Sequence, residues 1–280
     1  MLDEKRMNRV LEKLDTDQML ITDPFAIYYL TGRWIFAGER FLGLLIKKGK
    51  KPILYLNELF RFDEDLGVTK KMITDTDSVA ELLKYDVDPN KALGVDKTLA
   101  ARFLLPMIDG AIASKFINGS LAVDHTRAIK DEEEIALMRE SSHINDLAMA
   151  EFKKLPKSGI TEIEVANQML DIYKKLGAEA YSFSPIVAFG VNAADPHHMP
   201  DETVLHEGET VLFDVGCKYH GYCSDMTRTF FFKGTPTEEQ MRIYHLVRQA
   251  NEDAEAYVKP GVRLCDIDSK ARDVITRSEE

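Results

Sequence analysis

The hydrophobic and polar positions of the 280-residue chain predict short helices and strands in its first part. Apolar residues recur at helical spacing in four segments and in continuous or alternating runs in five others. Helices are expected over residues 3–14, 23–32, 77–85 and 98–108. Strands are expected over residues 19–21, 41–46, 52–56, 92–95 and 115–117. This alternation predicts a mixed or parallel sheet with flanking helices.

The pattern changes near Asn118, Gly119 and Ser120, which is a sequence typical of a connection between domains. We therefore expect two domains, over residues 1–122 and 123–280. The fold class predicted for the whole chain is mixed α+β.

Longer helices are expected beyond this boundary. Asp131 and Thr161 are each followed three residues later by a glutamate, which is the pattern of a capping box at a helix start. Two further helices are expected, one from Thr237 and one from Leu264. Between them lie a predicted strand over 182–190, a loop over 192–202 and a predicted hairpin over 209–232.

The hairpin carries two aspartates. Asp214 and Asp225 are equidistant from the midpoint between Tyr219 and His220, so a symmetric turn there would place them directly opposite each other. Directly opposed residues have Cβ atoms about 4.5–5.5 Å apart, and like charges at that distance destabilise a sheet. A shared proton, the nearby Arg228, or a pair of divalent cations held about 3.5–4 Å apart would compensate.

The alternative interpretation is two solvated aspartates near a turn. The neighbouring Phe213, Val215 and the run of three phenylalanines favour a buried hairpin, where an uncompensated charge is costly. These neighbours shift the balance away from the solvated turn, and all three compensations for the paired charges stay open at this point.

Composition excludes several classes of protein. A net charge of −11 argues against a nucleic-acid partner, which requires a basic face. The apolar runs are too short to span a bilayer, and the charged start is unlike a secretory signal. The unpatterned Cys217, Cys223 and Cys265 do not predict disulfides, so we expect a cytoplasmic protein.

Three motifs in close succession carry a family resemblance: N-A-A-D-P-H at 192–197, G-E-T-V-L-F-D at 208–214 and G-Y-C-S-D-M-T-R-T-F at 221–230. Together they resemble the metal-site segment of the Xaa-Pro peptidases, prolidase and aminopeptidase P. The resemblance implies a creatinase/prolidase-like N-terminal domain followed by a pita-bread domain.

The same resemblance implies roles for individual residues. Asp214 and Asp225 correspond to metal ligands, and His197, which follows Pro196, corresponds to a histidine that contacts the substrate. Because neighbouring side chains of an extended backbone point in opposite directions, one site would use only one of His197 and His198. His198 is expected near the substrate or behind the ligands.

Thr227 and Arg228 are likewise expected near the substrate or behind the ligands. Two divalent ions are expected, with Mn²⁺ favoured by oxygen ligands and Co²⁺ or Zn²⁺ as alternatives. The expected partners are an Xaa-Pro dipeptide or proline-containing peptide and a second copy of the chain in a homodimer. The family's remaining ligands would lie beyond Glu280, so we expect an incomplete pita-bread domain in a truncated chain.

Two other functions remain open from the sequence. One is a catalytically inactive pita-bread module for binding or dimerisation. The other is a creatinase-like amidinohydrolase, which the retained Asp214 and Asp225 disfavour because creatinase-like relatives do not use these ligands.

Overall fold

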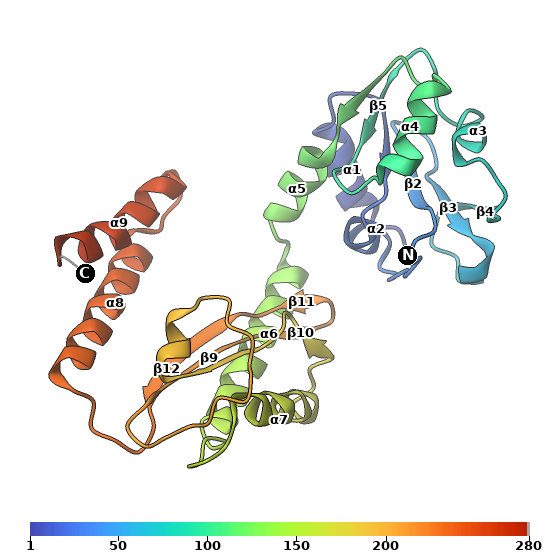
Figure 1. The fold of residues 1–280 in the computed structure, drawn as a ribbon. Helices are drawn as coiled ribbons and strands as arrows, with labels where there is room; N and C mark the ends of the chain where they lie inside the picture. The colour runs from blue at the N-terminus through green and yellow to red at the C-terminus, as the bar shows by residue number, and fades with distance from the viewer. Residues whose placement is uncertain (279–280) are drawn as a thin grey trace. The chain divides into compact units, whose positions relative to one another are not determined.

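The chain forms two compact units, Met1–Lys130 and Asp131–Glu280 (Figure 1). The structure is a computed structural model that describes residues 1–278. The units divide after the boundary expected between residues 122 and 123, because Ala122 and Val123 are buried in the N-terminal core. Within the described residues, no helix combines the length and apolar character needed to cross a membrane.

The N-terminal unit is built on one mixed sheet with the strand order β4-β3-β2-β1-β5-β6. The strands are β1 (Gln18–Ile21), β2 (Leu42–Lys47), β3 (Ile53–Asn57), β4 (Thr69–Ile73), β5 (Ala92–Val95) and β6 (Lys115–Asn118). β2 pairs antiparallel with β1 and β3, whereas the other three pairs are parallel. The expected mixed sheet is confirmed. Strand β4 was not predicted, because its two lysines give it a polar pattern that an edge strand tolerates.

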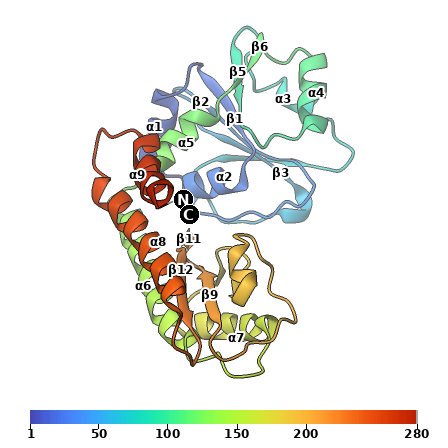
Figure 2. The ribbon, with the colours of Figure 1, turned by 60° about the vertical axis from the view of Figure 1, so that its left-hand side comes forward.

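Helices cover both faces of this sheet (Figure 2). They are α1 (Glu4–Glu12), α2 (Pro24–Thr31), α3 (Val79–Leu83), α4 (Ala101–Asp109) and α5 (Ser120–Ala128), with a 3₁₀ turn η1 (Glu58–Phe60). α1, α2 and α5 bury their apolar residues with Met19 and Ile21 of β1. Leu20, on the opposite face, packs with residues of α3 and α4. Strand β1 thus contributes side chains to the hydrophobic cores on both faces of the sheet, because successive residues of a strand point to opposite faces.

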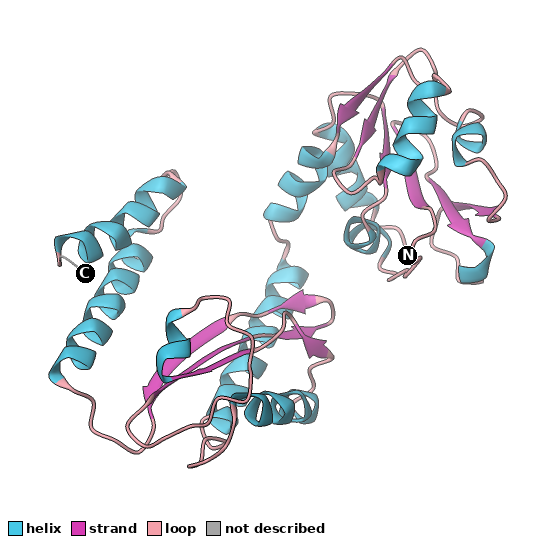
Figure 3. Cartoon of the chain, in the orientation of Figure 1, coloured by secondary structure: helices cyan, strands magenta, loops and turns pink. Residues whose placement is uncertain are grey.

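The C-terminal unit, as described from residue 131 to residue 278, contains two three-stranded sheets and four α-helices (Figure 3). The strand orders are β12-β9-β8 and β11-β10-β7. The strands are β7 (Ala180–Tyr181), β8 (Ile186–Phe189), β9 (Thr210–Val215), β10 (Cys217–Tyr219), β11 (Tyr222–Cys223) and β12 (Met226–Phe231). The helices are α6 (Glu132–Phe152), α7 (Glu162–Lys175), α8 (Glu238–Tyr257) and α9 (Leu264–Arg277), with a 3₁₀ turn η2 (Gly190–Ala194). The strand expected over 182–190 is shorter, because β8 begins only after Pro185.

Local capping signals explain where the helices begin. Asp131, Thr161 and Thr237 cap α6, α7 and α8, and each forms a complete capping box with the residue three positions on. These predicted helix starts are confirmed. α6 and α7 then pack on one face of the β12-β9-β8 sheet, where Val211 and Phe213 are fully buried.

The register of the hairpin differs from the one predicted. Asp214 pairs with Thr227 and Val215 with Met226, and the same register continues to the pair of Tyr219 and Tyr222. The turn therefore centres on His220 and Gly221, whose φ angles are 46° and 82°. Two central residues with positive φ form the tight hairpin turn that matches the twist of the strands. The prediction that Asp214 and Asp225 are directly opposed is wrong, because the partner of Asp214 lies two residues further along, at Thr227.

Candidate metal centre

The sheet face opposite α6 and α7 carries the predicted ligand Asp214. Strand β9 alternates strictly, with Val211, Phe213 and Val215 buried and Thr210, Leu212 and Asp214 partly exposed. The register sets Thr227 and Thr229 of β12 beside Asp214 and Leu212. This face is therefore a mixed polar and apolar surface, which suits a site that binds a ligand more than a packed core.

Asp214 and Asp225 interact although they are not directly opposed. The register, continued beyond Met226, sets Asp225 opposite Gly216, diagonally from Asp214 on the same face. Burial raises the pKa of the Asp214 carboxyl above its ordinary value, and the charge of Asp225 raises it further. The Thr227 hydroxyl opposes the rise by donating to Asp214 Oδ1 at 3.1 Å. The two carboxylates form a charge conflict of the kind that a bound cation relieves.

This conflict predicts a pH-dependent stability. A raised folded-state pKa means that the charge of Asp214 costs stability above that pKa, and the cost vanishes below the unfolded value of about 3.9. In EDTA at pH 7, Asp225→Asn should therefore raise the Tm by about 1–3 °C, and the gain should disappear at lower pH. Thermal melts between pH 3 and pH 8 measure it, with the exposed Asp171→Asn as control. A gain that persists at pH 3 would contradict this explanation.

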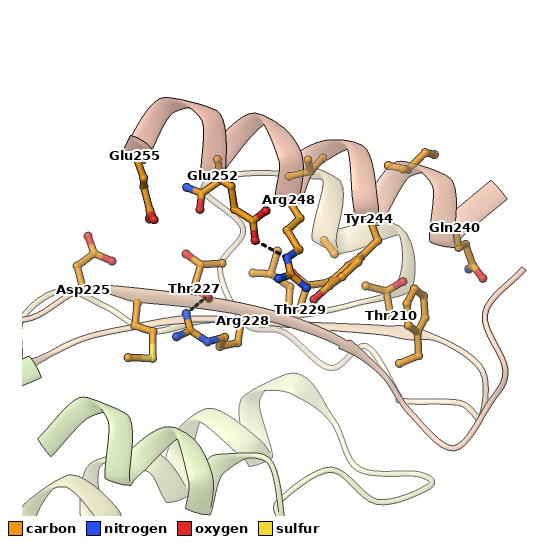
Figure 4. Close-up of a pocket in the computed structure, with 17 residues that line it drawn as sticks. Thr210, Asp225, Thr227, Arg228, Thr229, Gln240, Tyr244, Arg248, Glu252 and Glu255 are labelled. Atoms are coloured by element: carbon orange, nitrogen blue, oxygen red, sulfur yellow. Dashed lines mark hydrogen bonds and ion pairs between the residues drawn. The ribbon is translucent and has the colours of Figure 1, made fainter. Parts of the chain in front are cut away.

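An open cavity of about 1310 Å³ lies between this face and helix α8 (Figure 4). The sheet contributes Asp225, Thr227 and Thr229, and α8 contributes mostly polar residues. The labelled α8 residues in the close-up are Gln240, Tyr244, Arg248, Glu252 and Glu255. Arg248 Nε donates to Glu252 Oε1 at 2.7 Å, so the opposite charges of these two side chains neutralise each other. No pattern in the sequence indicates that α8 borders the site.

Arg228 lies differently from Asp214. It pairs with Phe213 in the register, so the alternation of side chains directs it to the face opposite the aspartates. Its Nη1 donates to the carbonyl oxygen of Thr227 at 2.8 Å. Because β12 is an edge strand, Arg228 still borders the cavity. This geometry does not support compensation of the aspartate charges by Arg228. Thr227 is the residue that donates a hydrogen bond to Asp214.

The two histidines lie on the loop that follows η2. Ala193 of η2 lines the same cavity as Asp225, which sets the start of this loop beside the aspartate face. His197 has an exposed side chain, and its backbone N–H donates to Asp195 Oδ1 at 2.9 Å. His198 is turned inward, with its Nε2 2.5 Å from Oε2 of Glu162. The two histidines thus have different environments.

A second cluster of potential ligands surrounds that contact. One ligand atom each of Glu162, His198 and Asp201 lies within 4.8 Å of the others. Hydrogen bonds from Thr203 lower the pKa of Asp201, and the Glu162 side chain and the charge of His198 lower it further. Glu162 was not among the predicted site residues, because an acidic residue in the first turn of a helix is already explained by the helix dipole.

Comparison with known proteins identifies both units. Residues 136–279 match metallopeptidase family M24, and residues 5–129 match the creatinase/prolidase N-terminal domain. An uncharacterised peptidase of Staphylococcus epidermidis is 34% identical over 272 residues, which are 97% of this chain and 77% of that protein.

Solved structures agree. The prolidase from Pyrococcus horikoshii is 28% identical with a TM-score of 0.85, over 99% of this chain and 78% of that chain. The Xaa-Pro dipeptidase from Bacillus anthracis is also 28% identical with a TM-score of 0.85, over 98% and 78% of the two chains. The expected resemblance and fold class are confirmed. The chain belongs to metallopeptidase family M24, the metal-dependent peptidase family of the prolidases, and carries a creatinase/prolidase N-terminal domain.

Proposed function

We propose that this protein hydrolyses the peptide bond before proline in an Xaa-Pro dipeptide or a longer proline-containing peptide. The observation that carries the proposal is the pair of interacting carboxylates, Asp214 and Asp225, on one face of the sheet of an M24 chain. The adjoining cavity gives a peptide access to Asp225. The prolidase and Xaa-Pro dipeptidase among the similar structures support the substrate class.

The chemistry of the two aspartates fits divalent metal ions. Carboxylate oxygens are hard ligands that suit Mn²⁺, with Co²⁺ or Zn²⁺ as alternatives. Their mutual repulsion is relieved by a cation, which supports joint ligation. Divalent ions take four to six ligands, so the site requires further groups besides these two carboxylates. We propose two bound ions, as the family resemblance implies.

The residues of this chain have defined tasks in such a reaction. Asp214 and Asp225 would hold the divalent ions, which when bound would supply Lewis acidity at the scissile carbonyl. The Thr227 hydroxyl fixes the orientation of the Asp214 carboxylate through its hydrogen bond. His197, whose imidazole is exposed, donates a hydrogen bond to the carbonyl oxygen or the prolyl nitrogen as charge develops there.

The proposal is tested by Mn²⁺-dependent release of proline from Ala-Pro, with His197→Ala as the diagnostic variant. Loss of one donor to developing charge should lower kcat about a hundredfold and leave KM little changed. His125→Ala, at an exposed histidine of the N-terminal unit, serves as control and should retain full activity. Equal activity of His197→Ala and wild type would remove His197 from the mechanism. A wild-type chain that releases no proline with Mn²⁺ would refute the proposed activity.

We further propose that the protein acts as a homodimer in the cytoplasm. An exposed aromatic group supports an interaction surface, because Trp34 packs on Phe25 with ring centroids 4.9 Å apart while both side chains remain about half exposed. Phe36 on the same loop is also exposed. Sedimentation velocity measures the oligomeric state.

The free thiols of Cys217, Cys223 and Cys265 agree with a reducing compartment such as the cytoplasm.

A further inference from the structure

Glu162 is a fully buried carboxylate at the first position of α7. A charge in such a place is costly unless hydrogen bonds satisfy it. Oε1 accepts from the Phe189 backbone N–H at 2.7 Å and from Asn192 Nδ2 at 3.1 Å. Oε2 lies 2.5 Å from His198 Nε2 and accepts from the Asp201 backbone N–H at 3.2 Å.

These four partners, counted over the described part of the chain, all belong to one segment. Phe189 ends β8, Asn192 lies in η2, and His198 and Asp201 follow it, so the anchors extend over residues 189–201. A further hydrogen bond links the start of the segment to the residues after it, because Asn192 Nδ2 donates to Thr203 Oγ1 at 3.0 Å. The carboxylate of Glu162 therefore contacts both ends of the segment 189–201, which carries His197.

The cluster does not need a cation to explain it. A carboxylate has about four lone-pair sites, and four nitrogen atoms of the described residues occupy them around Glu162. Each of these contacts is within hydrogen-bonding distance, so they use the acceptor capacity that a metal would need. Glu162 therefore has a structural role: the length and the charge of its side chain set the positions of the four groups that contact it.

We propose that Glu162 is a positioning residue for His197. It holds the ring of His198 inward, and His197, the next residue, is left with an exposed side chain on the loop that adjoins the cavity. The role of Glu162 rests on the proposed function, because it acts only by placing a side chain that takes part in that reaction. An error of about 1 Å in such placement costs about a hundredfold in rate.

The test uses Glu162→Gln, with Asp171→Asn on the exposed side of the same helix as a matched control. Glutamine has one oxygen and one NH₂ group, so the NH₂ must face two of the four nitrogen partners. The backbone amides of residues 189–203 should exchange about tenfold faster or more, and the ring signals of His197 should shift in NMR spectra. Well below the Tm, kcat for Ala-Pro should fall about tenfold to a hundredfold with KM within about twofold. Glu162→Asp keeps both oxygens and should recover part of each loss.

The outcomes separate the two proposals. Unchanged exchange and unchanged His197 signals in Glu162→Gln would overturn the positioning role, as would a lower Tm with unaltered kcat in the folded protein. If Glu162→Gln does not fold, an unaltered kcat in Glu162→Asp overturns the proposal and a reduced kcat supports it. If the wild-type chain releases no proline, the proposed function fails. Exchange rates and His197 signals then decide whether Glu162 positions His197.

Discussion

Replacing both Asp214 and Asp225 by asparagine should abolish metal-dependent hydrolysis of Ala-Pro. The two carboxylates interact on one sheet face, and each asparagine removes the negative charge that attracts a divalent ion. Loss of several kcal/mol of charge stabilisation corresponds to a fall in kcat of about a thousandfold or more. Proline release at saturating Mn²⁺ measures the effect.

The substitution is nearly isosteric, so a loss of activity is not a loss of fold. Asparagine keeps the Oδ1 acceptor that receives the hydrogen bond of Thr227. Two exposed aspartates of α7 and α8, Asp171 and Asp253, provide the control pair Asp171→Asn/Asp253→Asn. Wild-type rates in the Asp214→Asn/Asp225→Asn variant would show that the reaction does not depend on this pair.

Gly216→Ala should strongly destabilise the hairpin. A Cβ atom at this position would lie 2.0 Å from the carbonyl oxygen of Ser224 and 2.2 Å from Ser182 Oγ. Neither atom yields easily, because Ser182 Oγ also donates to that carbonyl oxygen at 2.8 Å. We expect a loss of about 3 kcal/mol in the free energy of unfolding, measured by urea denaturation.

Gly159→Ala gives the matched comparison. Gly159 has a φ angle of 85°, and no atom of the described residues would lie within 4 Å of a Cβ added there, so only the backbone preference is lost, about 1 kcal/mol. The difference between the two variants isolates the steric term at Gly216. Since Gly216 lies opposite Asp225 in the register, Gly216→Ala should also weaken Mn²⁺ binding. Equal losses in both variants would contradict the close packing of the hairpin against Ser182.

Local signals in the sequence were sufficient for much of the fold. A helix was expected over residues 23–32, and the structure confirms α2 between its cap at Asp23 and Gly32, which lies in the left-handed region at φ 70°. Capping boxes predicted the starts of α6, α7 and α8. These signals are reliable because each involves residues only a few positions apart.

Features that depend on distant partners were not predictable in the same way. The predicted pairing of the hairpin was off by two residues, because the sequence does not reveal that His220, a non-glycine residue, adopts a positive φ. Glu162 was missed because its four partners lie 27 to 39 positions further along the chain. The cavity-lining face of α8 is also set by tertiary arrangement alone.

The motifs allowed the candidate metal residues to be named without knowledge of the register. Asp214 and Asp225 share a face whether they are directly opposed or diagonal, since both arrangements keep the alternation of the strand. The charge conflict between them therefore persists in the corrected register. Thr227 was expected near the ligands, and it is the cross-strand partner of Asp214.

Calorimetric titration of the wild-type chain with Mn²⁺, beside the Asp214→Asn/Asp225→Asn variant, tests the central claim most directly. We expect saturable binding to the wild-type chain that is lost in the variant and kept in Asp171→Asn/Asp253→Asn. Binding of equal stoichiometry and affinity in wild type and variant, or no binding to either, would contradict a metal centre built on these two aspartates.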